Sequence, residues 1–370
     1  MSIKSKKIGI VLSGGGIRAT IYHLGVLKWL AESGLLESIE YISSVSGGSL
    51  CVGLVYAHND KKWPNSRQYL NHVLPKVEEI IMSSDIQLSA LLRMFPFWMH
   101  RKVNLLAKVI GMKWGVSGLM SDLDESPVWC ANCTTYETGK RFGITQEKMG
   151  DIVIGYAEGH NFPISDAMAA SAGFPVLIGP YALRRDRYSW SASTFEATIS
   201  TNDRPIPRGR HFNLWDGGVY DNLGLEAFFH ISDSPSGGRL SQGVDYVIIS
   251  NASTVSGFKR RGLSSNPMRL LDIAMDQVNI LRRRSITSHM RQQNNGMFFQ
   301  IGDSASSILK NSDLDAESVK QIILESLPRH QAAHVKNYPT TLRRPTQADF
   351  NMILRHGYEV ARCVHLVTKT

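Results

Sequence analysis

The 370-residue sequence has only four cysteines, too few to hold a chain of this length together through a disulfide framework. Cys130 and Cys133 have the C-x-x-C spacing of some metal sites, but neither a second pair nor clustered histidines complete a ligand set. We therefore expect no metal and no cofactor, and we interpret the two residues as thiols of a strand.

The sequence also lacks any run of the about eighteen apolar residues that a membrane-crossing helix needs. Its N-terminus does not look like a secretory signal, because residues 1–7 are polar and basic and the apolar run that follows, Ile8 to Leu12, is only five residues long. We expect a protein that is made in the cytoplasm and stays there or at the surface of a membrane, while export without a cleaved signal stays open.

Acidic residues are outnumbered, since 41 Lys and Arg against 32 Asp and Glu give a net charge of +9. This charge favours anionic partners such as phospholipid surfaces or nucleic acid. No long basic tail, RNA-binding signature or zinc-finger spacing accompanies it, so nucleic acid is the weaker choice. The basic residues form small separate sets: Lys4, Lys6 and Lys7; Arg184, Arg185 and Arg187; Lys259, Arg260 and Arg261; and Arg282, Arg283 and Arg284.

The chain shows neither an internal repeat nor a linker-like break, and its 43% hydrophobic content can fill a large core. We expect residues 1–370 to form a single domain, with the informative motifs between about residues 8 and 225 and residues 226–370 completing it.

The first part of the chain has the pattern of a βαβα unit with a parallel sheet. The run Ile8 to Leu12 predicts a buried strand, and apolar residues at spacings of three and four predict a helix over 17–33. A second strand over 39–45 leads through a tight turn into another helix. Further patterns predict strands over 128–134, 140–145, 244–250 and 297–301, and helices over 63–82, 164–172, 270–290 and 349–364 and from Leu225.

Residues 86–114 crowd apolar and aromatic side chains around Pro96, and three basic residues follow at 100–102. This pattern fits a lid at a lipid interface, and it fits a pair of core helices somewhat better. A long surface loop is expected over 189–210.

Ser46 stands where the second strand turns into a helix, and Gly47 and Gly48 follow it. A serine at such a corner projects its hydroxyl out of the backbone, and small neighbours permit strained dihedral angles and the approach of a substrate. The turn matches the G-x-S-x-G nucleophile pattern, except that Ser44 replaces the first glycine. Alone this is a weak signal, because Ser-Gly-Gly is common in loops.

The loop after the first strand can supply backbone N–H groups at the positive end of a helix dipole. Such amides stabilise the oxyanion of an ester's tetrahedral intermediate, which makes Gly14, Gly15 and Gly16, together with Gly47, candidates for an oxyanion hole. Arg18 opposes the helix dipole, which favours an anion beside it, either a headgroup phosphate or a carboxylate. An ordinary surface arginine explains it equally well.

The same loop fits a second pattern, since Gly14-x-Gly16-x-x-Ala19 matches the dinucleotide-binding fingerprint. That interpretation needs an acidic residue at the end of the second strand. Glu37 and Glu40 lie before the strand instead, so the sequence disfavours a nucleotide site.

Asp216 follows a predicted strand and precedes Gly217 and Gly218, at a loop where its carboxylate could face Ser46. A free aspartate with a pKa near 3.9 is a poor base at neutral pH. It would have to hydrogen-bond directly to the serine in a partly desolvated site. By itself, an Asp-Gly-Gly sequence is more often a turn.

Together these segments resemble the patatin-like phospholipases, a family that shares its fold with the catalytic domains of cytosolic phospholipases A2. The resemblance rests on Gly14-Gly15-Gly16-Ile17-Arg18, Ser44-Val45-Ser46-Gly47-Gly48, Ala170-Ser171-Ala172-Gly173-Phe174-Pro175, and Asp216-Gly217-Gly218 with Asn222. It implies an α/β fold with three layers, α/β/α, around a central, mostly parallel sheet. It also implies metal-free hydrolysis of lipid acyl esters by a Ser–Asp dyad without a histidine.

We therefore expect a serine hydrolase of lipid acyl esters, of the phospholipase A or lysophospholipase type. Ser46 attacks the ester carbonyl, Asp216 takes its proton, the glycine amides hold the oxyanion, and Arg18 orients the glycine loop or a phosphate. One alternative is an α/β-hydrolase with a Ser-His-Asp triad, in which His230 or His289 is the base. The other is a catalytically inactive lipid-binding module.

Overall fold

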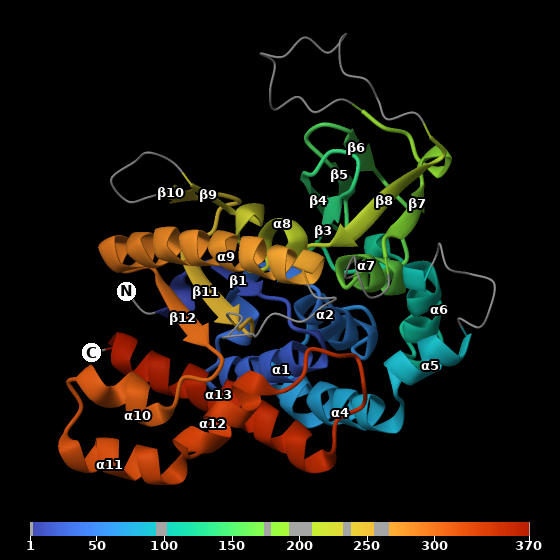
Figure 1. Cartoon of the computed structure of the whole chain (residues 1–370). Helices are drawn as coiled ribbons and strands as arrows, with labels where there is room; N and C mark the ends of the chain where they lie inside the picture. The colour runs from blue at the N-terminus through green and yellow to red at the C-terminus, as the bar shows by residue number, and fades with distance from the viewer. Residues whose placement is uncertain are drawn as a thin grey trace.

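A central β-sheet with helices on both faces forms the body of the protein (Figure 1). We describe it from a computed structural model for residues 3–93, 102–173, 179–191, 209–231, 238–254 and 266–369. The strands are β1 (Ile8–Leu12), β2 (Ile39–Val45), β3 (Val128–Thr135), β4 (Arg141–Ile144), β5 (Lys148–Asp151), β6 (Gly155–Glu158), β7 (Tyr181–Arg184), β8 (His211–Asp216), β9 (Phe229–Ile231), β10 (Gly238–Leu240), β11 (Tyr246–Asn251) and β12 (Gly296–Gln300). The α-helices are α1 (Gly16–Glu32), α2 (Gly47–Ala57), α3 (Ser66–Gln68), α4 (Leu74–Ser83), α5 (Ile86–Arg93), α6 (Lys102–Trp114), α7 (Ile164–Ser171), α8 (Gly218–Asp221), α9 (Asn266–Gln293), α10 (Ala305–Ile308), α11 (Ala316–Glu325), α12 (Arg329–Asn337) and α13 (Gln347–Lys369).

The core of the sheet is parallel, with the strand order β12-β11-β1-β2-β3. Beyond β3 the sheet continues antiparallel through β4, β5 and β6, and β8 pairs with both β3 and β7. Helices α1, α2 and α13 lie on one side of the sheet, and α8 and α9 lie on the other (Figure 1). The predicted three-layer α/β/α fold is therefore confirmed, with an antiparallel extension that the sequence patterns did not reveal.

Helix α1, which follows the glycine loop, is buried between the sheet and α13. Two glycines allow the two helices to approach closely. A Cβ atom on Gly25 would lie 2.0 Å from the Leu354 carbonyl oxygen, and one on Gly357 would lie 2.1 Å from that of Tyr22. The C-terminal helix thus packs directly on the element that carries the predicted oxyanion loop.

Most predicted elements are present, and the differences have local causes. The helix predicted from Leu225 is wrong, because a single 3-10 turn, Leu225–Ala227, leads into β9, which pairs with β10. Within residues 86–114, α6 is a core helix that buries Val103, Leu106 and Ile110. Residues 94–101 of that segment, and most of the loop predicted over 189–210, lie outside the described residues. No helix within the described ranges has both the length and the apolar character needed to cross a bilayer.

Candidate active site

Ser46 forms the corner between β2 and α2, with a φ of 52° and a ψ of −117°. A positive φ is uncommon for a residue other than glycine, and strained backbone of this kind is typical of functional sites. The close packing explains the two glycines that follow. A Cβ atom on Gly47 would lie 2.2 Å from the Gly16 carbonyl oxygen, and one on Gly48 would lie 2.2 Å from that of Leu12.

Asp216 ends β8 beside Cys133 of β3, and its side chain is buried, with 4% exposure. The Ser46 hydroxyl lies close enough to its carboxylate to lower its pKa as a hydrogen-bond donor, and its Oδ1 accepts a hydrogen bond from the Gly218 N–H at 2.7 Å. Burial raises the pKa of Asp216 to about 6, against the lowering effect of these two donors. The carboxylate is therefore a stronger base than an exposed aspartate and still mostly ionised at pH 7.

Ser44, which replaces the first glycine of the nucleophile pattern, belongs to a buried chain of hydrogen bonds. Trp129 Nε1 donates to Ser44 Oγ at 2.8 Å, and the hydroxyls of Ser44 and Ser49 are 2.8 Å apart. The hydroxyls of Ser49 and Ser171 are also 2.8 Å apart, and Ser171 Oγ donates to the Asn132 carbonyl oxygen at 2.7 Å. The chain has one direction, since the indole N–H only donates and the carbonyl only accepts.

This chain fixes the backbone of the nucleophile turn. Ser171 Oγ accepts the backbone N–H of Ser46 at 3.0 Å. Its own hydrogen goes to Asn132, so its oxygen can accept from both Ser46 and Ser49. The Ser46 amide therefore already has an acceptor. Helix α7, which carries Ser171, holds the turn in place through this bond. The sequence identified the small-residue block around Ser171 but not this role.

The glycine loop packs against the same turn, since a Cβ atom on Gly14 would lie 3.2 Å from the Cβ of Ser46. The Gly14 N–H donates to the Asn222 carbonyl oxygen at 3.1 Å and is already occupied. Over the described part of the chain, the amides of Gly15, Gly16 and Gly47 have no hydrogen-bond acceptor. These three are the amides that remain for an oxyanion.

Arg18 does not face an anionic side chain within the described residues. Its buried guanidinium, with 4% exposure, donates to the carbonyl oxygens of Tyr338 at 2.7 Å, Lys336 at 3.0 Å and Ala252 at 3.2 Å. Burial lowers the pKa of Arg18 to about 10, so the side chain still carries its charge at neutral pH. The geometry favours a role in orienting the loop over one in binding a phosphate.

The segment 338–344, which follows α12, borders the glycine loop. The Ile17 N–H donates to the Thr341 carbonyl oxygen at 2.8 Å, and that oxygen would lie 2.6 Å from a Cβ atom on Gly16. Leu342 and Gln87 exchange two hydrogen bonds, of 3.0 and 3.3 Å, so the segment also contacts the start of α5. We call residues 338–344 the brace. The sequence did not reveal it, because it has no regular apolar pattern.

His289 and His230, the candidate bases of the Ser-His-Asp alternative, make contacts outside the predicted site. His289 lies on α9, near the Asn295 side chain at 3.3 Å, with its ring edge-on to Phe229. His230 is exposed on β9 and pairs with Arg239 of β10. Neither forms a hydrogen bond with the predicted nucleophile or base in the ranges described.

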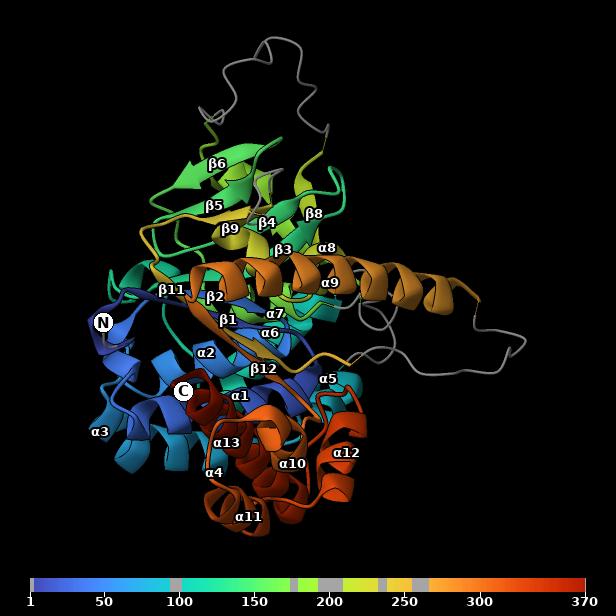
Figure 2. The same ribbon diagram turned by 90° about the vertical axis from the view of Figure 1, so that its left-hand side faces the viewer.

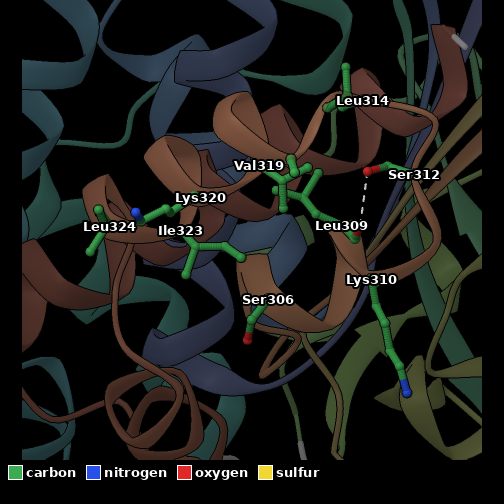
Figure 3. Close-up of a pocket in the computed structure, with 10 residues that line it drawn as sticks. Ser306, Leu309, Lys310, Ser312, Leu314, Val319, Lys320, Ile323 and Leu324 are labelled. Carbon is green, nitrogen blue, oxygen red and sulfur yellow. Dashed lines mark hydrogen bonds between the residues drawn. The ribbon is translucent and has the colours of Figure 1, made fainter.

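Two further observations concern ligand sites. The four cysteines are free and buried, and the described residues contain no group of three or more His, Cys, Asp or Glu side chains that could hold a metal ion. A pocket of about 470 Å³ lies in the C-terminal part, beside α11 (Figure 3). Its lining includes Leu309, Val319 and Ile323, and none of the predicted site residues.

Comparison with known proteins places the chain in a family. The model of the patatin-like phospholipases matches residues 10–229, which include the glycine loop, Ser46 and Asp216. The chain belongs to the patatin-like phospholipase family. Cytosolic phospholipase A2 zeta of Mus musculus is 37% identical over 79 residues, which are 21% of this chain and 9% of that protein. Cytosolic phospholipase A2 gamma of Mus musculus is 44% identical over 52 residues, which are 14% of this chain and 9% of that protein.

A solved structure shares the fold of this patatin-like chain. Human GIVD cytosolic phospholipase A2 has a TM-score of 0.53 at 14% identity, and the similarity covers 99% of this chain and 61% of that one. The chain thus spans less than two thirds of the length of these relatives. The patatin-like match ends at residue 229, so α9, the brace and α13 lie beyond it.

Proposed function

We propose that this patatin-like protein is a serine hydrolase of lipid acyl esters, of the phospholipase A or lysophospholipase type. The observation that carries the proposal is the buried carboxylate of Asp216 beside the Ser46 hydroxyl. A serine hydroxyl is a weak nucleophile unless an adjacent base accepts its proton, and Asp216 has both the contact and the raised pKa that this role needs.

In the proposed reaction, Ser46 Oγ attacks the ester carbonyl while its proton passes to Asp216. The amides of Gly15, Gly16 and Gly47 stabilise the negative oxygen of the tetrahedral intermediate. Each such donor is typically worth a hundred- to a thousand-fold in rate, on the order of 3–4 kcal/mol. Asp216 then gives the proton to the departing alcohol, and it activates the water that releases the fatty acid from the acyl-enzyme.

Arg18 and the brace act in this proposal as positioning groups. The amides of the glycine loop are useful only if they point at the developing oxyanion within a few tenths of an ångström. Arg18 and Thr341 hold the loop through the carbonyl of Tyr338 and the amide of Ile17. The expected substrates are phospholipids or other lipid esters at a membrane surface, with no role for nucleic acid.

The test is fatty-acid release from phospholipid vesicles, with the products identified by mass spectrometry. We expect release by the native protein and none by Ser46→Ala or Asp216→Ala, with both variants folded. His230→Ala and His289→Ala should retain activity, because the proposed base is a carboxylate. Vesicle binding without release, together with no labelling of Ser46 by a fluorophosphonate, would instead identify an inactive lipid-binding module.

A further inference from the structure

The first part of α9 carries an exposed apolar stripe. Leu270, Ile273 and Leu281 are 70%, 42% and 61% exposed, and a helix of 3.6 residues per turn places them on one face. Single exposed leucines are ordinary, but three large apolar side chains on one helical stripe mark an interaction surface. Figure 2 shows the first turns of α9 extending beyond the strands that its later turns cross.

Toward the C-terminal end of α9, the same face carries positively charged side chains. Arg284 and Arg291 are exposed, and helical geometry places them on the same side of α9 as Leu270, Ile273 and Leu281. The helix has two acidic residues, Asp272 and Asp276, and helical geometry places both on the opposite side from Leu270. The exposed face therefore begins with apolar side chains, and the charged side chains toward its end are all basic.

We propose that this face, formed by Leu270, Ile273, Leu281, Arg284 and Arg291, binds the surface of an anionic lipid bilayer. A helix with an apolar stripe and arginines beside it lies in the interface, with the apolar side chains at the headgroup–acyl boundary and the cations at the phosphates. The inference rests on the proposed function, because a lipid ester substrate is presented in such a surface.

Contacts on the inner side of α9 connect this surface to the catalytic segment. Arg282 Nη2 contacts Glu226 Oε2 at 2.6 Å, and Arg282 Nη1 lies 3.6 Å from Asp221 Oδ2. Asp221 ends α8, the short helix that begins two residues after Asp216. The lipid-facing side chains therefore project from a helix whose other side holds the segment of the proposed base.

The experiment measures sedimentation of the full chain with vesicles, in a Ser46→Ala background so that the lipid stays intact. The vesicles are phosphatidylcholine with or without phosphatidylserine. Combined replacement of Leu270, Ile273 and Leu281 by serine should weaken binding to the anionic vesicles roughly tenfold or more. Combined Arg284→Gln and Arg291→Gln should weaken binding to the anionic vesicles only and reduce its dependence on salt.

The matched control is Leu324→Ser, which changes the most exposed large apolar side chain of the described residues, 76% exposed on α11. It should bind like the parent, and thermal unfolding should show that every variant is folded. Unchanged binding by the triple serine variant, or an equal loss in Leu324→Ser, would overturn the proposal. So would a dimer in light scattering that the triple variant converts to a monomer with vesicle binding intact, because the face would then join two copies.

A separate assay distinguishes this inference from the proposed function. With Ser46 restored, the triple serine variant should hydrolyse a soluble short-chain ester at the native rate while losing hydrolysis of anionic vesicles. If the native protein hydrolyses no ester, the proposed function fails, whereas the sedimentation result still decides the fate of the lipid-binding face.

Discussion

The hydroxyl of Ser46 lies beside the carboxylate of Asp216 and lowers its pKa, although the two residues come from opposite ends of the family match. Ser46 is half-buried and reaches the surface, whereas Asp216 is buried behind it. Because Asp216 is screened from solvent and Ser46 is accessible, the arrangement should affect both the pH dependence of the reaction and the stability of the protein.

The first consequence is a pH profile. Asp216 must be ionised to accept the proton of Ser46, and its pKa is raised to about 6. We expect kcat/KM on a soluble ester to fall about tenfold per pH unit below pH 6 and to reach a plateau above it. A profile that stays flat from about pH 5 to 8 would contradict the assignment of Asp216 as the base.

The second consequence concerns stability. A carboxyl with a pKa of about 6 in the folded chain and near 3.8 in the unfolded chain holds its proton more tightly when folded. Its contribution to stability is greatest at low pH and is lost as the pH rises from about 4 to 6. Asp216→Asn should therefore be more stable than the native protein at pH 8, by at most about 3 kcal/mol. Urea unfolding at pH 5 and pH 8 measures the difference, which should shrink at the lower pH.

A third prediction tests the hydroxyl chain. Ser44→Gly restores the usual nucleophile pattern, but it leaves the Trp129 N–H buried without an acceptor. The change should lower the free energy of unfolding by about 1–3 kcal/mol. The loss should be smaller in a Trp129→Phe background, where no donor is orphaned. Equal losses in both backgrounds would show that the chain does not carry this stability.

A fourth prediction concerns Arg18. Arg18→Gln releases the glycine loop from the carbonyls of Tyr338 and Lys336, and we expect kcat to fall about ten- to a hundredfold with KM little changed. The control is Arg355→Gln, which also removes a bond to a backbone carbonyl, that of Glu325 at 2.6 Å, and an ion pair with Glu359, both outside the glycine loop and the brace. A similar fall of kcat in the control would show that general destabilisation, not loop position, is responsible.

Local pattern was enough to predict the parallel core and to select the candidate site residues. The nucleophile turn at Ser46 and the glycine loop follow short apolar strands, and such turns are encoded within a few residues. The short strands β5, β6 and β7 were missed because runs of only four residues are too short to give a clear period.

The hydrogen-bond partners of Arg18 could not be predicted from the sequence for a different reason. A cation in the first turn of a helix suggested an anion, but three backbone carbonyls stabilise it instead. Which carbonyls converge on one point depends on how α12, the brace and the end of β11 pack together, which no local spacing encodes. The role of Ser44 was likewise hidden, since its partner Trp129 lies on a neighbouring strand.

The brace also makes the glycine loop depend on a late part of the chain. Gly15 and Gly16 are made early, but the carbonyl of Thr341 that fixes the following amide is made hundreds of residues later. A nascent chain that already contains Ser46 and Asp216 still lacks the carbonyl that accepts the Ile17 amide until Thr341 has been made. The glycine loop therefore reaches its described position only when residues 338–344 are also in place.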